Sequence, residues 1–185
     1  MTTKLKDIAS IQTGLFARTV SEGDIVYLQA KHFNENGLIM NNIHPELIRN
    51  DSVERHLLNP GDVLFAAKGT RNFAVVFDIR NQPCVASTSF FVIRLQGSFV
   101  SPEYLAWYLN HPITQQLLKK QAIGTSIASI SKPVLEELEI SVPDLKTQQT
   151  VLEIARLRSK EKLLKKQIEV LREQQIQHLI IKAII

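Results

Sequence analysis

Two cations flank a glycine where two apolar runs are interrupted, in the segment Lys68-Gly69-Thr70-Arg71. Lysine and arginine contact nucleic-acid phosphates, and a glycine, which has no Cβ, lets backbone N–H groups approach the same anion. Arginine can also bind a guanine edge through two hydrogen bonds. The segment is therefore a candidate anion contact. The alternative is an ordinary surface loop, which is polar because its backbone must stay hydrated.

Patterns typical of catalytic and metal sites are missing from the sequence. A nucleotide-binding P-loop needs Gly-Lys-Ser/Thr at the start of a helix, whereas Lys68-Gly69-Thr70 leads into a predicted strand. The five histidines have no metal-ligand spacing, and Cys84 has no second cysteine with which to bind zinc. The glutamates within residues 136–139 are typical of a solvated rim. We predict no catalytic residue, no metal and no cofactor, so a binding module is the favoured class.

The apolar runs on either side of the cationic segment predict a β-hairpin. Residues 63–67 follow a turn signal, Asn59-Pro60-Gly61-Asp62, and residues 73–77 are β-branched and aromatic. Such a hairpin would carry Lys68 and Arg71 at its tip.

Two further extended segments are predicted. Residues 24–39 contain a tight turn at residues 34–37, which end in glycine. Residues 84–97 are predicted as one continuous strand, polar at Ser87-Thr88-Ser89 and apolar beyond it. Together with the hairpin, these segments indicate a β-rich domain.

Short helices are predicted after residue 100. Ser101 is a suitable N-cap, and an aromatic stripe at helical spacing is expected to be core rather than a ligand platform: Tyr104, Trp107 and Tyr108. The helix stops or kinks at Pro112, and a second one follows. A hydroxyl-rich loop then contains Gly124-Thr125-Ser126, for which local capping is the alternative to a binding role.

From Asp144 onward the sequence contains no glycine and no proline, which predicts one long helix. A helix of roughly 40 residues is about 60 Å long, so it needs a partner helix to cover it. With Glu161 as the one polar exception, the heptad a and d positions are apolar at Ile154, Leu157, Leu164, Ile168 and Leu171. Other apolar residues leave this pattern, in a second row and beyond residue 171: Leu163, Val170, Ile176, Leu179, Ile180 and Ala183.

Charge and composition narrow the class of protein. Residues 1–145 contain 13 Lys/Arg and 14 Asp/Glu, whereas residues 146–185 contain 9 and 4, so the excess positive charge lies in the long helix. No segment reaches the ~20 apolar residues of a membrane span, and the first ten residues lack an apolar signal core. With a single cysteine, these features predict a cytoplasmic protein that does not contact membrane.

The order of these segments resembles the specificity subunits of Type I restriction-modification enzymes. The resemblance covers almost the whole chain, through "YLQAKHFNENGLI", "LLNPGDVLFAAKGT", "SPEYLAWYLN" and "IGTSIASISKPVLEELEISVPDLKTQQTVL". The most specific signature is "LEELEISVPDLKTQQ", which looks like the family's entry into its spacer helix.

The resemblance implies an α+β protein that reads DNA and has no catalysis of its own. It implies a target recognition domain at residues 1–143 and a spacer helix at residues 144–185, which would form an antiparallel coiled coil. Family members usually hold two of each, so the chain looks like a half-size subunit that forms a homodimer on a bipartite target in double-stranded DNA. A fragment of a two-domain subunit is the alternative. The implied partners are a DNA methyltransferase (modification) subunit and an endonuclease (restriction) subunit.

The resemblance also assigns roles to candidate DNA-binding residues. Lys68 is expected on phosphate, and Arg71 on phosphate or a guanine edge, with Gly69 and Thr70 between them. Gly124, Thr125 and Ser126 would form a second contact loop. Weaker candidates for base reading are Arg18, Lys31, Asn34 and Asn36, while Lys119 and Lys120 are either backbone contacts or solvated helix ends. The alternative function is a helical adaptor or oligomerisation protein with a small protein-binding domain.

Overall fold

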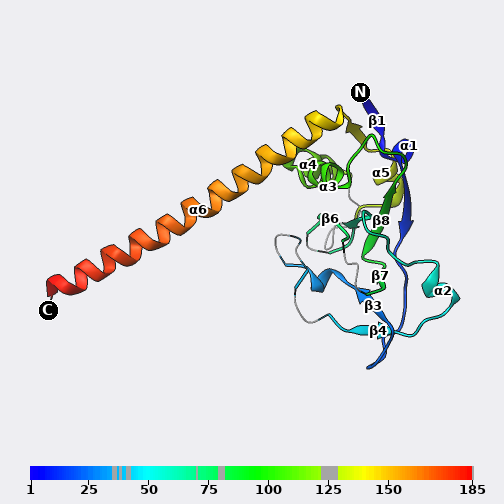
Figure 1. Cartoon of the computed structure of the whole chain (residues 1–185), viewed down its shortest axis with the longest axis horizontal. Helices are drawn as coiled ribbons and strands as arrows, with labels where there is room; N and C mark the ends of the chain where they lie inside the picture. The colour runs from blue at the N-terminus through cyan, green and yellow to red at the C-terminus, as the bar shows by residue number, and fades with distance from the viewer. Residues whose placement is uncertain are drawn as a thin grey trace. The chain divides into compact units, whose positions relative to one another are not determined.

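The computed structural model describes residues 1–34, 37, 39–40, 43–69, 71–78, 82–121 and 129–184. It contains two compact units, residues 1–145 and residues 146–185. Figure 1 shows strands and short helices in the first unit and one long helix in the second, so the predicted α+β class is confirmed. In chain order the elements are β1 (Thr2–Lys4), α1 (Leu5–Ile8), β2 (Ala9–Thr13), β3 (Ile25–Leu28), η1 (Ala30–His32), β4 (Pro45–Leu47), α2 (Asp51–Glu54), β5 (Val63–Ala66), β6 (Ala74–Val76), β7 (Cys84–Ala86), β8 (Phe90–Leu95), α3 (Pro102–Asn110), α4 (Pro112–Lys120), α5 (Lys132–Glu136), β9 (Glu139–Ser141) and α6 (Leu145–Ile184).

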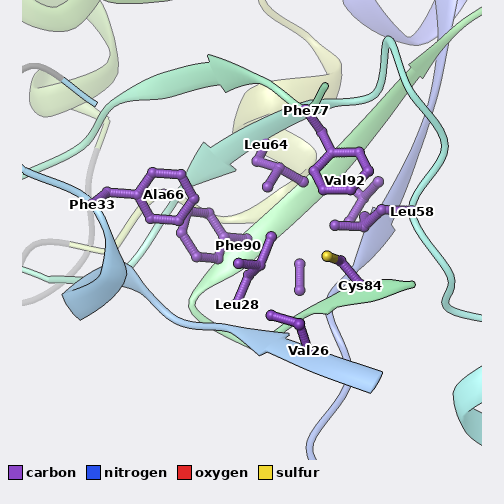
Figure 2. Packing of buried hydrophobic residues seen from close by; sticks show 11 residues of the cluster. Val26, Leu28, Phe33, Leu58, Leu64, Ala66, Phe77, Cys84, Phe90 and Val92 are labelled. Atoms are coloured by element: carbon purple, nitrogen blue, oxygen red, sulfur yellow. The ribbon is translucent and has the colours of Figure 1, made fainter. Parts of the chain in front are cut away.

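Two sheets contribute the core of the first unit. One sheet has the strand order β2-β8-β5-β6 and the other has the order β4-β3-β7. Figure 2 shows their apolar side chains in one cluster, with Leu64 and Phe90 from the first sheet and Val26 and Leu28 from the second. Cys84 belongs to this cluster, and burial raises the pKa of its thiol to about 11, as expected for a core residue.

The predicted hairpin is present. β5 pairs with β6 in antiparallel register, Val63 opposite Val76 and Phe65 opposite Ala74. All four residues of β5 are buried, because β5 also pairs with β8 on its other side and so lies inside the sheet. The hairpin therefore carries the cationic segment on a rigid base.

Residues 84–97 do not form the one continuous strand that the sequence predicts. β7 pairs with β3, whereas β8 pairs with β2 and β5 in the other sheet. Between them, residues 87–89 form a turn in which the Phe90 N–H donates to the Ser87 carbonyl at 2.9 Å and the Ser89 N–H donates to Ser87 Oγ at 3.4 Å. Serine side chains compete for nearby backbone donors and so favour turns. The chain uses this turn to cross between the sheets.

The predicted helix pair is confirmed at residues 102–120. Ser101 is the N-cap of α3, since its Oγ accepts from the Tyr104 N–H at 3.1 Å, and α4 begins at Pro112. Of the aromatic stripe, Tyr104 is buried, whereas Trp107 and Tyr108 are partly buried. Tyr104 is therefore the one residue of the aromatic stripe that is fully part of the core.

An ion pair between the half-exposed Arg94 and the buried Asp62 holds the turn that precedes β5. Arg94, on β8, donates from Nε and Nη2 to the two carboxylate oxygens of Asp62, each at 2.7 Å. The carboxylate is 2% exposed and also accepts from the Asn59 N–H at 2.8 Å. Hydrogen bonding to Asp62 raises the pKa of Arg94. These two parallel hydrogen bonds offset the free-energy cost of burying the charged Asp62 carboxylate.

The N-terminal strand lies beside the segment that leads into the long helix. β1 pairs antiparallel with β9, and the Leu5 N–H donates to the Leu138 carbonyl at 2.9 Å. Glu137 accepts hydrogen bonds from both Lys4 and Lys6 at this junction. These two hydrogen bonds lower the pKa of Glu137 to about 2, and the bond from Lys4 has the larger effect.

We expect Glu137 to titrate near pH 2, below its ordinary value of 4.5. Because its pKa is lower in the folded state, the pairs stabilise the fold above pH 4.5, and this contribution fades as pH falls toward 2. A carboxyl-carbon NMR titration measures the midpoint, and the variant Lys4→Ala/Lys6→Ala should return it toward 4.5. A midpoint that does not move in this variant would contradict the assignment.

The second unit is formed by the helix α6, which runs for 40 residues from Leu145 to Ile184, as the lack of glycine and proline predicts. The predicted a and d residues are all exposed in the single chain, at between 48% and 63%. No helix among the described residues has both the length and the apolar character needed to cross a membrane. Exposed aliphatic side chains in such number on one helix are typical of an interaction surface.

Candidate nucleic-acid interface

The cationic hairpin tip is held by backbone contacts on both sides. The Asn72 side chain is buried and donates from Nδ2 to the Ala66 carbonyl at 2.9 Å, which closes the tip. The Ala67 N–H donates to the Ser89 carbonyl at 2.9 Å, which joins the tip to the turn at residues 87–89. Gly69 has a φ of +130°, a conformation that favours glycine. Lys68 is exposed at this fixed position.

The second predicted contact loop ends beside the same tip. Lys68 forms an antiparallel bridge with Ser129, and the Ile130 N–H donates to the Ala67 carbonyl at 3.0 Å. Gly124, Thr125 and Ser126 lie outside the described residues, as do Thr70 and Asn36. The chain at Ser129 and Ile130 therefore passes beside the cationic tip.

Arg71 connects the tip to the segment after β3. Its Nη2 donates to the Asn34 carbonyl at 2.8 Å, and its guanidinium lies 5.6 Å from the centroid of the Phe73 ring. Phe73 packs in turn on Phe33 and Phe90, with ring centroids 5.5 and 6.0 Å away. The guanidinium is thus oriented by an aromatic cluster before any ligand binds, which reduces the entropic cost of binding.

The turn at residues 87–89 gathers the ends of β2, β3 and β5 at one edge, which we call the candidate edge. β2 and β5 both pair antiparallel with β8, so they run in the same direction and end at the same edge. Gly14, directly after β2, lies so close to the turn that a Cβ there would meet the Ser87 carbonyl oxygen at 2.1 Å. The Ser87 N–H donates to the Leu28 carbonyl, at the end of β3, at 2.8 Å. Exposed cations follow two of these ends, Arg18 after β2 and Lys31 after β3.

A hollow of about 370 Å³ brings Lys119 to Arg71. Its lining also includes Asn72, Asn110 and Gln115. Asn110 Nδ2 and Oδ1 bond both backbone groups of Ala74, at 2.7 and 2.8 Å, and so fix α3 to the hairpin. Lys120 is exposed at the end of α4 and is not part of this lining.

Sequence reasoning missed some members of this edge. It treated Ser87-Thr88-Ser89 as part of a strand, and it did not single out Gln115. The hydroxyls were visible in the sequence as a polar interruption of an apolar run, whereas nothing near Gln115 in the chain indicates that it lies beside Arg71. Hydroxyl and amide side chains supply the donors and acceptors that contact phosphates and base edges.

The described part of the chain contains no group of three or more His, Cys, Asp or Glu side chains placed to hold a metal ion. Burial lowers the pKa of His32, whose Nδ1 accepts from the Gln29 N–H at 3.2 Å. Lys68, Arg71 and Lys119 are exposed cations, and cations are the side chains that bind an anion such as a phosphate.

Comparison with known proteins identifies the fold. In the structure described as the "structural basis underlying complex assembly and conformational transition of the type I R-M system", one chain matches with a TM-score of 0.70 at 16% identity, over 97% of this chain and 43% of that one. The Type I restriction-modification S subunit of M. genitalium matches with a TM-score of 0.59 at 13% identity, over 86% and 39%. The HsdS subunit of Thermoanaerobacter tengcongensis matches with a TM-score of 0.61 at 16% identity, over 90% and 39%.

The chain therefore spans less than half the length of these structures. A search of curated proteins finds no match. A family model matches residues 1–173, and its description is the Type I restriction modification DNA specificity domain. This match covers the β-rich unit and most of α6, and it confirms the resemblance found in the sequence. The chain belongs to the Type I restriction-modification DNA specificity domain family.

Proposed function

We propose that the chain is a sequence-specific DNA-binding specificity subunit that reads one half of a bipartite target. The observation that carries the proposal is the gathering of cationic, hydroxyl and amide side chains from separate segments at one edge of the sheets, in a member of the DNA specificity domain family. Lys68 would contact phosphate, while Arg71 and Lys119 would bind on either side of their shared hollow.

The subunit would have no catalysis of its own and would direct a methyltransferase and an endonuclease to the DNA. Support comes from the family and from the neighbouring structures, which include a type I R-M system assembly. The near-neutral charge of residues 1–145 is consistent with such a role, because a domain with little net charge depends on its partners and on specific contacts for affinity.

The chain would form a homodimer through Ile154, Leu157, Leu164, Ile168 and Leu171, which we call the seam. Glu161 favours antiparallel pairing of two seams. In a parallel pair the two Glu161 carboxylates would lie in one layer and repel each other, whereas in an antiparallel pair each lies opposite Leu164 of the second copy. Lys165 lies 2.6 Å from Glu161 and lowers its pKa, so the carboxylate stays charged. Two identical domains would then read two identical half-sites.

The experiment that tests DNA binding uses Lys68→Ala. Binding of the full chain to a fluorescent duplex of mixed sequence is measured by anisotropy at several salt concentrations. Loss of one phosphate contact should weaken binding about 3- to 10-fold on every sequence and should reduce the salt slope by about 1. The aromatic support of the tip does not involve Lys68, so the fold should be unchanged.

Lys6→Ala is the matched control. It removes the same charge from α1, which leads directly into the start of β2 at the end opposite the candidate edge, and there Lys6 pairs with Glu137. If Lys68→Ala and Lys6→Ala weaken DNA binding equally, only the net charge of the chain matters. The assignment of Lys68 to a phosphate contact is then wrong. Binding that does not change with salt would favour the adaptor function instead.

A further inference from the structure

Phe16 is an exposed aromatic residue in a unit that buries most of its phenylalanines. It is 79% exposed, and among the described large apolar residues of the first unit only the terminal Met1 is more exposed. Of the other phenylalanines, Phe73 is partly buried, Phe99 is 46% exposed and the rest are buried. Single exposed apolar residues are common on protein surfaces, so exposure alone assigns Phe16 no role.

The backbone that carries Phe16 is held on both sides of the preceding residue. The Leu15 N–H donates to the Ala86 carbonyl at 2.8 Å. The Leu15 carbonyl accepts from the hydroxyl of the buried Tyr27, also at 2.8 Å. Both backbone groups of Leu15 are therefore bonded to the β-rich unit, and the exposed Phe16 follows directly from a rigid base.

Phe16 belongs to the candidate edge, as Lys68 does. β2 and β5 pair with the two sides of β8, so their ends are about 10 Å apart, which is twice the spacing between strands. Gly14 follows β2, and its N–H donates to the carbonyl of Phe90, the first residue of β8, at 3.0 Å. Phe16 comes two residues after Gly14, and Lys68 comes two residues after the end of β5. A duplex, whose major groove alone is about 12 Å wide, can therefore contact both residues.

We infer that Phe16 inserts its ring between two base pairs of the bound DNA, as a wedge that unstacks the step and kinks the duplex. The inference rests on the DNA binding proposed above. Apolar side chains, phenylalanine among them, act as such wedges in DNA-binding proteins, and an aromatic ring stacks on any base. A wedge must not yield when the base step resists, and the bonded backbone of Leu15 supplies that rigidity. The steps that unstack most easily, TA and CA/TG, are the ones expected to accept the ring.

A cation accompanies the proposed wedge. Phe16 and the exposed Arg18 line one hollow of about 310 Å³. The rest of its lining is both polar and apolar and includes Asn50, Ser52 and Ile48. A cation beside the wedge can bind a phosphate that flanks the opened step. Because residues 1–145 contain 13 Lys/Arg and 14 Asp/Glu, charge attraction alone gives little affinity, and a stacking contact adds a contribution that salt does not weaken.

The fluorescence of 2-aminopurine tests the wedge, because this adenine analogue becomes brighter when it is unstacked. Duplexes that the full chain retains from a random pool supply the sequence, and the probe replaces each adenine in turn. We expect the fluorescence at one step to rise when the full chain binds, and Phe16→Ala should abolish this rise. The variant should also weaken binding at least about fivefold through the lost stacking. The salt slope should stay the same, because no charge is removed.

Phe99→Ala is the matched control. It removes a second exposed phenylalanine, which follows the end of β8 and so belongs to the edge opposite the candidate edge. This variant should retain both the affinity and the fluorescence rise. Phe16→Leu keeps an apolar wedge and should retain the rise as well.

A mismatch at the brightened step separates a wedge from a ring that only touches the surface of the duplex. Mismatched bases are easier to unstack, so insertion of the ring costs less free energy there. The full chain should therefore bind the mismatched duplex more tightly than the paired one, and Phe16→Ala should show a smaller gain. An equal gain for both proteins would contradict insertion.

Failure of the wedge and failure of DNA binding give different results. If Lys68→Ala weakens binding but Phe16→Ala changes neither the affinity nor the fluorescence, DNA binding stands and the wedge is wrong. The exposed ring would then be available to a protein partner instead. If the full chain retains no duplex from the random pool, the proposed function and the wedge both fail.

Discussion

Replacing Leu164 and Ile168 by glutamate is expected to convert the proposed homodimer to monomers. Both side chains belong to the seam and are 48% and 49% exposed in the single chain, so the changes remove contacts between copies without disturbing the first unit. An antiparallel dimer contains each residue twice, so four apolar side chains would be replaced by charges in the layers around Glu161. Light scattering measures the mass, and circular dichroism checks that α6 remains helical.

Loss of the dimer should also reduce binding to a two-half-site target. When both half-sites are engaged, the second contact is intramolecular and raises the overall affinity by 10²- to 10⁴-fold. We therefore expect the double variant to bind such a duplex at least about 100-fold more weakly, while its affinity for one half-site is unchanged. Anisotropy titrations on both duplexes measure the difference.

Leu163→Glu/Val170→Glu is the matched control for the seam. It makes the same kind of change at two aliphatic residues of α6 that are 59% and 50% exposed and lie outside the seam. This variant should remain dimeric. If Leu163→Glu/Val170→Glu is monomeric while Leu164→Glu/Ile168→Glu remains dimeric, the interface lies on the row of Leu163 and Val170 and not on the seam.

Local features of the fold could be predicted from the sequence. Ser101 followed by a proline marks the start of α3, and the absence of glycine and proline marks α6, because caps and breakers act within a few residues. The hairpin around Lys68 follows from two apolar runs and a polar break. The crossing at residues 87–89 was missed because a polar interruption within a strand and a turn between two strands have the same residue pattern.

The candidate edge could be predicted only in part. Lys68 and Arg71 stand out because their types and their spacing around a glycine are local. That Arg71 reaches the Asn34 carbonyl and shares a hollow with Lys119 depends on how two sheets and a helix pack. In the chain Arg71 is 37 positions from Asn34 and 48 positions from Lys119. No pattern within a short window of sequence encodes contacts over such separations.

The seam and the candidate edge lie in separate parts of the chain, so variants of the two can be measured independently. The seam lies in residues 146–185 and the edge in residues 1–145. Variants of the seam should change mass and the binding of paired half-sites, while variants of the edge should change the binding of any duplex. Their free-energy effects should therefore be additive on a single half-site, as is usual for distant residues.

Arg94→Met is expected to lower the free energy of unfolding of the first unit by about 3 kcal/mol, because it leaves the buried Asp62 carboxylate without its charged partner. Asp62 is 2% exposed and receives two hydrogen bonds from Arg94, both of which the change removes. Urea unfolding followed by the fluorescence of Trp107, the single tryptophan, measures the change. The Leu164→Glu/Ile168→Glu background keeps the measurement independent of dimerisation.

Two further variants identify the buried charge as the cause. Arg49→Met breaks an ion pair with Glu54 in which both side chains are at least 40% exposed, and it should cost no more than about 0.5 kcal/mol. Adding Asp62→Asn to Arg94→Met removes the unpaired charge and should recover part of the lost stability, because a neutral amide costs less to bury than a carboxylate. If the double variant is less stable than Arg94→Met alone, the cost lies in the hydrogen bond from Asn59 to Asp62 rather than in the buried charge.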